Sequence, residues 1–235
     1  MFKFEELVLE QLILELRFEN GYLYLDNCGK TFREIIKRYT GIKEETVNVN
    51  EAKLVLPEDE ISLKFYSTNF ILVQNYPSNL NTVCEFGDFS YEIVMKNFGI
   101  DAFTRVGNRF IYTLKVGSVE EATELLKKTG FFNVSEEKKA KIGATLKDPG
   151  VKFTIVRDDG IGYIVNIAYF NRKYEVKLPK PVTAKYDMTK FSETGLTIDI
   201  DYHTLKPVDR GALVVSDLLK KNKKNIEFII KELFN

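Results

Sequence analysis

The chain has 235 residues, 44% of them hydrophobic and 13% aromatic, which is enough for one large core or two compact halves. Its 34 basic residues balance 34 acidic ones, and a zero net charge disfavours a general nucleic-acid binder, which is usually basic. Two separated cysteines exclude a disulfide framework, and the short apolar runs exclude a membrane-spanning helix. The start of the chain lacks the pattern of a secretory signal, so we expect a soluble cytoplasmic protein.

The first part of the chain predicts an opening strand that turns back in a short hairpin, then one short helix, three strands and one long helix. Partly alternating apolar residues predict the opening strand at 7–18, and Asn20-Gly21 predicts a tight turn into a returning strand at 22–25. Apolar residues at helical spacing then predict the first helix. The remaining expected elements are that helix at 28–40, strands at 45–56, 61–67 and 70–76, and a helix from Ser78 or Asn79 to Phe98.

The second part of the chain repeats this order. Ser118 and Glu121 have the spacing of a capping box, which predicts a helix that begins after a strand at 100–115 and ends at Gly130. The charged residues 133–141 predict a solvated loop or helical turn. The further expected elements are strands at 151–157, 161–170, 173–178 and 195–202, hairpin turns at 158–160 and 171–172, a loop near 182–192, and a final helix at 209–234.

This repeated order predicts an internally duplicated α+β fold. We expect two β-α-β(3-4)-α units, 1–98 and 99–235, each an antiparallel sheet covered by a long helix, joined edge to edge or packed back to back. Similar topology occurs in the helix-grip ligand-binding fold and in TATA-binding protein. The sequence motifs of those two families are absent, so the likeness concerns shape alone.

Three short segments resemble a sporadically distributed prokaryotic family of uncharacterised proteins about 250 residues long. They are Leu16-Arg17-Phe18, Arg105-Val106-Gly107-Asn108-Arg109-Phe110-Ile111 and Asp199-Ile200-Asp201-Tyr202. The centre of that family typically reads Arg-x-Gly-Leu-Arg-Tyr-Ile, so Asn108 and Phe110 depart from it. The resemblance implies an accessory role and carries no known activity.

One predicted strand carries the most reactive set of side chains. Asp199, Asp201 and His203 are spaced by two, so on a strand they share one face. Two carboxylates and an imidazole could bind a divalent metal or act as an acid/base pair. Alternatively, they form an exposed polar face that meets basic residues on neighbouring strands, which we favour because the chain has a single histidine.

Arg105 and Arg109 also share one face of their strand, unless Gly107 introduces a bulge. They could clamp a phosphate or carboxylate. Alternatively, they pair with Asp199 and Asp201 across the sheet in a partly buried charge network. We favour the network because covered, unpaired charges are costly.

These residues favour a non-catalytic binding or interaction protein, with a protein or small molecule as its partner and with room for a homodimer. Its binding residues would be Arg105, Arg109, Asp199, Asp201 and His203. No cofactor, metal or catalytic set is expected, because the chain lacks a phosphate-binding glycine loop and metal-spaced cysteines. The alternatives are a metal- or anion-assisted enzyme on the Asp199 strand and nucleic-acid binding by Lys220, Lys221, Lys223 and Lys224, which more often form a solvated helix face.

Overall fold

The computed structural model describes residues 4–19, 21–143, 147–175 and 190–234. Within these residues, the large sheet contains β1 (Val8–Arg17), β2 (Glu44–Val47), β3 (Ala52–Leu56), β4 (Ile61–Phe65), β5 (Asn69–Asn75), β7 (Arg105–Lys115), β8 (Gly150–Val156), β9 (Ile161–Glu175) and β10 (Lys190–Thr204). The helices are α1 (Tyr24–Arg38), α2 (Asn81–Phe98), α3 (Val119–Lys128), α4 (Glu136–Ile142) and α5 (Val215–Phe234). The short strands β6 (Ala102–Phe103) and β11 (Val208–Asp209) pair with each other, and 3-10 turns lie at Phe4–Glu6, Pro57–Asp59 and Arg210–Ala212.

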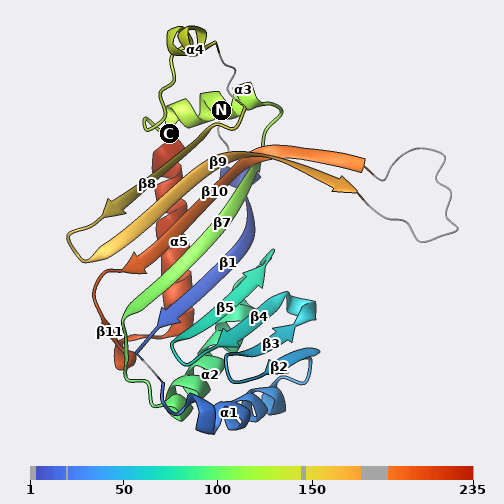
Figure 1. Cartoon of the computed structure of the whole chain (residues 1–235), viewed down its shortest axis with the longest axis vertical. Coiled ribbons are helices and arrows are strands. Elements are labelled where there is room, and N and C mark those ends of the chain that lie inside the picture. The colour runs from blue at the N-terminus through green and yellow to red at the C-terminus, as the bar shows by residue number, and fades with distance from the viewer. Residues whose placement is uncertain (1–3, 20, 144–146, 176–189, 235) are drawn as a thin grey trace, which may run out of the picture.

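Nine of the described strands form one continuous antiparallel sheet in the order β2-β3-β4-β5-β1-β7-β10-β9-β8 (Figure 1), and β6 and β11 form a separate two-stranded sheet. The predicted fold class, with two separate sheets that each carry a long helix, is therefore wrong. The strands that open the two predicted units, β1 and β7, pair with each other along most of their length, with Leu14 opposite Asn108. Units 1–98 and 99–235 thus share a sheet, because β1 uses one edge for β5 and the other for β7.

Helices cover one face of this sheet. Helix α5 packs on β7 and β10, α2 packs on β5 and against α5, and α1 packs against α2. Figure 1 shows the central strands in front of α5. Alternate strand residues point to this helical layer and are fully buried, among them Leu12, Leu14, Leu16, Phe110, Ile198 and Ile200. Their neighbours in sequence point to the opposite side, which we call the open face.

A glycine allows the two long helices to approach. A Cβ added to Gly87 of α2 would lie 2.9 Å from side-chain atoms of both Leu72 in β5 and Val215 in α5. Any larger residue would push α2 away from the sheet or from α5. Both helices end at the predicted residues, 98 and 234, but α2 begins at Asn81 and α5 begins at Val215, later than the predicted start at residue 209.

Several local predictions are confirmed and others are corrected. The hydroxyl of Ser118 accepts a hydrogen bond from the Glu121 N–H at 3.2 Å, as a helix cap should, and Gly130 adopts a left-handed φ of 73°. The region 22–25 is not a strand, since α1 begins at Tyr24, and 171–172 is not a turn, since β9 continues to residue 175.

Further differences concern the ends of elements. The predicted strand 45–56 is divided into β2 and β3, and the charged stretch 133–141 contains α4. The predicted turn residue Asn20 and most of the predicted loop 182–192 lie outside the described residues. Among the helices that the structure describes, none has the length and apolar character needed to cross a membrane.

Candidate functional site

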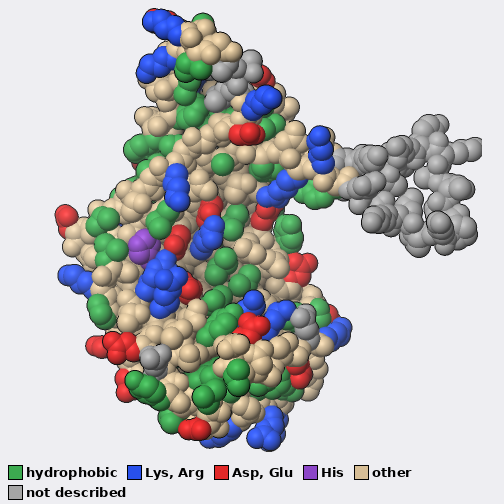
Figure 2. Space-filling view, in the orientation of Figure 1, with side chains coloured by type: hydrophobic (Ala, Val, Ile, Leu, Met, Phe, Trp, Pro, Cys, Tyr) green, Lys and Arg blue, Asp and Glu red, His purple; other side chains and the backbone are tan. Residues whose placement is uncertain are grey.

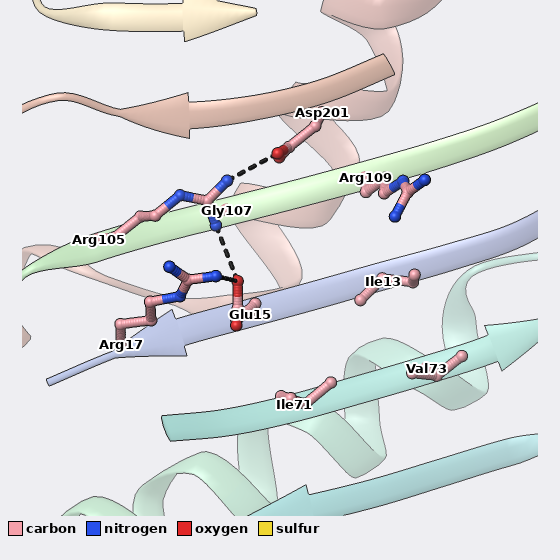
Figure 3. A pocket seen from close by; sticks show the side chains of 9 residues that line it. All are labelled: Ile13, Glu15, Arg17, Ile71, Val73, Arg105, Gly107, Arg109 and Asp201. Carbon is pink, nitrogen blue, oxygen red and sulfur yellow. Dashed lines mark hydrogen bonds and ion pairs between the residues drawn. The ribbon is translucent and has the colours of Figure 1, made fainter. Parts of the chain in front are cut away.

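The candidate site lies on the open face, over the four strands in the middle of the sheet. Strands β5, β1, β7 and β10 are consecutive neighbours, and their outward side chains line a hollow of about 370 Å³. Figure 2 shows acidic and basic side chains gathered over this part of the face. The residues that line the hollow are Ile13, Glu15, Arg17, Ile71, Val73, Arg105, Gly107, Arg109 and Asp201 (Figure 3).

Arg105 joins two acidic side chains from different strands. Its Nη1 donates to Glu15 Oε2 at 2.9 Å, and its Nη2 donates to Asp201 Oδ2 at 2.7 Å. Glu15 Oε2 also accepts a hydrogen bond from Arg17 Nη2 at 2.9 Å. Figure 3 shows this chain of contacts across β1, β7 and β10. We refer to Arg17, Glu15, Arg105, Asp201, Arg109 and Asp199 as the ion-pair network.

Gly107 makes room for the guanidinium of Arg105. A Cβ at residue 107 would lie 2.3 Å from Arg105 Nη1, closer than any real contact. Gly107 introduces no bulge, because it pairs in register with Glu15 on one side and His203 on the other, so Arg105 and Arg109 share a face as predicted. Arg105 therefore lies flat on the sheet over Gly107 and can reach both carboxylates.

Arg109 forms the second part of the network. Its Nε and Nη2 donate to the two oxygens of Asp199 at 2.7 and 2.6 Å, the two-pronged geometry that suits guanidinium and carboxylate. The hydrogen bond with Asp199 raises the pKa of Arg109, so the group stays charged. The Arg109 side chain is 47% exposed, whereas that of Asp199 is 12% exposed, so the arginine covers its partner.

Asp201 is in a less favourable electrostatic environment. Burial raises the pKa of its carboxyl, and the attraction of Arg105 and of His203 offsets this effect only in part. The side chains of Arg105 and Asp201 are 20% and 22% exposed. A charge at this depth is tolerated because Arg105 neutralises it.

His203 lies beside the network without joining it through its side chain. Its ring covers Gly162, where a Cβ would be 2.7 Å from Nε2, and its Nδ1 is 3.4 Å from the main-chain oxygen of Asp201. Within the described residues, no three His, Cys, Asp or Glu side chains are placed to hold a metal ion. The strand face predicted from residues 199, 201 and 203 exists, but arginines occupy both of its carboxylates.

The predicted pairing of the two arginines with the two aspartates is thus present. Which arginine binds which aspartate could not be predicted from the sequence. Arg109 lies directly opposite Asp201 in the sheet yet binds Asp199, while Arg105 reaches Asp201. Sequence reasoning missed Glu15 and Arg17 as members of the network. Their spacing of two on an alternating strand was the available signal, because it places both on one face.

A second set of ion pairs extends along the same face. Arg172 of β9 donates to both oxygens of Glu10 at 2.6 and 2.9 Å, and its guanidinium lies 4.3 Å from the ring centre of Phe170. Lys115 lies 3.0 Å from Glu193, and this contact lowers the pKa of Glu193. These pairs come from residues far apart in sequence, so no local pattern predicted them.

The predicted basic face is not part of this site. Lys220, Lys221, Lys223 and Lys224 belong to α5, on the other side of the sheet, and Lys223 forms an ion pair with Glu227.

The comparisons with protein-family models and with curated proteins find no match to this chain. The three segments that resemble the uncharacterised prokaryotic family lie on the neighbouring strands β1, β7 and β10, and membership of that family stays a prediction.

Proposed function

We propose that this chain is a non-catalytic binding protein whose ligand or partner occupies the hollow on the open face. The observation that carries the proposal is the one-sided helical layer. Helices bury one face of the sheet, while the opposite face has a concavity of about 370 Å³, within the size range of ligand sites.

The lining of the hollow supports recognition of a molecule with both apolar and hydrogen-bond-accepting parts. Ile13, Ile71 and Val73 are half-buried and form an apolar floor on β1 and β5. Arg17 and Arg109 are the most exposed arginines at its rim, at 54% and 47%. Each guanidinium has five N–H groups, and the ion pairs described above use one in Arg17 and two in Arg109. The remaining donors suit carboxylate, phosphate or carbonyl oxygens.

The ion-pair network also favours binding over chemistry. Asp199 and Asp201 each accept hydrogen bonds from an arginine, so neither is a free base or a free metal ligand. The competing hypothesis of a metal- or anion-assisted enzyme on Asp199, Asp201 and His203 would require both pairs to open first. Pairing of this kind instead fixes the side chains in a prearranged surface, which reduces the entropy lost on binding.

The test combines a search for ligands with a change in the floor of the hollow. A small-molecule thermal-shift screen and affinity capture of proteins are run with the wild type, with Ile71→Glu and with Leu25→Glu. Leu25 is an exposed residue of α1 and serves as the matched control. A genuine ligand of the hollow should lose affinity about tenfold or more with Ile71→Glu and keep it with Leu25→Glu. Equal binding to both variants, or substrate turnover that depends on Asp199 or Asp201, would contradict the proposal.

A further inference from the structure

Strand β8 is an unprotected edge of the sheet. It forms one end of the sheet order, and its outer edge has no partner strand within the described residues (Figure 1). Its sequence, GVKFTIV, contains a single charge, at Lys152. Strand β2 at the other end is shorter and carries Glu44 and Glu45. Proteins usually protect edges by shortness and charge, so β2 is protected and β8 is exposed to pairing.

The hydrogen bonds to β9 show which backbone groups of β8 point outward. Arg157 N–H donates to the oxygen of Ile161 at 2.8 Å, and Tyr169 N–H donates to the oxygen of Pro149 at 2.9 Å. In an antiparallel pair such positions recur at every second residue, so the odd-numbered residues of β8 bond to β9. The N–H and C=O groups of the even-numbered residues 150, 152, 154 and 156 therefore point away from the sheet.

The apolar layer under β8 is also incomplete. Val151, Phe153 and Ile155 are only half-buried on the helical side, although their neighbours Val165 and Ile167 in β9 are fully buried. The ring of Phe131 stacks on Phe153 at 4.2 Å and is itself 57% exposed. Within the described residues, the core thus continues to the rim of the sheet and is only partly covered there.

We propose that β8 pairs antiparallel with β8 of a second copy of this chain, so that the sheet continues across a two-fold axis at Phe153. In this register Lys152 faces Thr154 of the partner, and Gly150 faces Val156 of the partner. Every outward N–H and C=O of β8 then finds a partner, because these pairs join the even-numbered residues of the two copies.

The side chains of β8 are self-complementary in this register. On the helical side Val151 faces Ile155, and Phe153 faces its own copy, so the incomplete apolar layers of both chains join. The neighbouring registers, centred on Lys152 and on Thr154, each pair only five of the seven residues of β8 with one another, and the first also places two lysines opposite each other. Like charges directly opposite are destabilising, so the arrangement centred on Phe153, which pairs all seven residues, is favoured.

Sedimentation of the full chain over a concentration series tests the pairing. The wild type should sediment at twice its 27.1 kDa at high concentration. Thr154→Pro removes one outward N–H and leaves the bonds to β9 intact, so it should sediment at half the wild-type mass. Glu45→Pro, at the other edge of the sheet, is the matched control and should stay dimeric. A monomeric wild type, or a dimer that survives Thr154→Pro, would overturn the proposal.

Disulfide formation tests the register. Phe153→Cys should cross-link to itself under mild oxidation, because residue 153 faces its own copy at a closely spaced pair. Ile155→Cys should not, because it faces Val151. Cys28 and Cys84 are buried, so the wild type should give no cross-linked product. Cross-linking by Ile155→Cys but not Phe153→Cys, in variants that retain the wild-type melting temperature, would exclude this register.

Discussion

The guanidinium of Arg105 lies against the backbone of Gly107, two residues along the same strand. A Cβ at residue 107 would be 2.3 Å from Nη1 of Arg105. The glycine therefore determines where the central arginine lies, and through it how Glu15 and Asp201 are joined. Gly107 is therefore a positioning residue of the ion-pair network, because its lack of a side chain leaves room for the Arg105 guanidinium.

Gly107→Ala should break both ion pairs of Arg105, because the flexible guanidinium would move before the backbone does. The expected loss in the free energy of unfolding is about 1–3 kcal/mol, measured by urea denaturation. Gly29→Ala is the control, since a Cβ there meets nothing within 4 Å and should stabilise α1 by about 0.5–1 kcal/mol. In an Arg105→Met background the cost of Gly107→Ala should largely disappear. An equal cost in both backgrounds would place the effect of the glycine elsewhere.

The two arginine–aspartate pairs should differ in strength. Double-mutant cycles with Arg→Met and Asp→Asn measure each coupling free energy. Arg109 is 47% exposed, so its coupling to Asp199 should be about 0.5–1 kcal/mol and should weaken in high salt. The Arg105–Asp201 pair is more deeply placed and should couple by about 1–3 kcal/mol with less dependence on salt. The reverse order of the two couplings would contradict this account of the network.

Asp201 should give the fold an unusual pH dependence. Its pKa is raised by burial, so the folded state holds this proton more tightly than the unfolded state does. Its stabilising contribution is therefore present below the unfolded pKa and is lost as the pH rises through the higher folded value. Relative to Asp201→Asn, the wild type should gain stability as the pH falls from 7 toward 3.5. Urea denaturation of both proteins across this range measures the difference in the free energy of unfolding. If the wild type becomes less stable relative to Asp201→Asn on acidification, the pKa of Asp201 is not raised in the folded state.

Much of the network could be predicted from spacing alone, because strand alternation fixes which side chains share a face. Asp199, Asp201 and the two arginines of β7 were placed correctly on this basis. Spacing does not specify which strand lies beside which. The pairing of β1 with β7 joins residues that are 88 (Arg17 and Arg105) to 105 (Val8 and Thr113) positions apart, and it makes one sheet of the two that were expected.

The same limit explains the misread turn at 171–172. Asn171 and Arg172 are ordinary turn residues by local chemistry, but in the structure they pair with Thr194 and Glu193 in β10. Arg172 is also held by Glu10, which is 162 residues away in sequence. Tertiary partners of this kind override local preference, and they are invisible in a single segment.

A buried amide pair between the sheet and α5 offers a test of how the helical layer is held. Asn222 Nδ2 donates to Asn108 Oδ1 at 2.8 Å, and both side chains are fully buried. The other polar atoms, Asn108 Nδ2 and Asn222 Oδ1, have no hydrogen-bond partner among the described residues. Asn222→Leu should destabilise the fold by about 1–3 kcal/mol, because it leaves the whole Asn108 amide unpaired.

The double variant, Asn108→Val with Asn222→Leu, should be more stable than Asn222→Leu alone, because it removes both buried polar groups together. Its free energy of unfolding should be close to that of the wild type. Urea denaturation of the three proteins measures the order. A double variant less stable than Asn222→Leu would contradict this account, because Asn108 would then stabilise the fold even without the Asn222 amide. The expected order, with the double variant close to the wild type, would instead show that the amide pair adds little net stability while it positions α5 on β7.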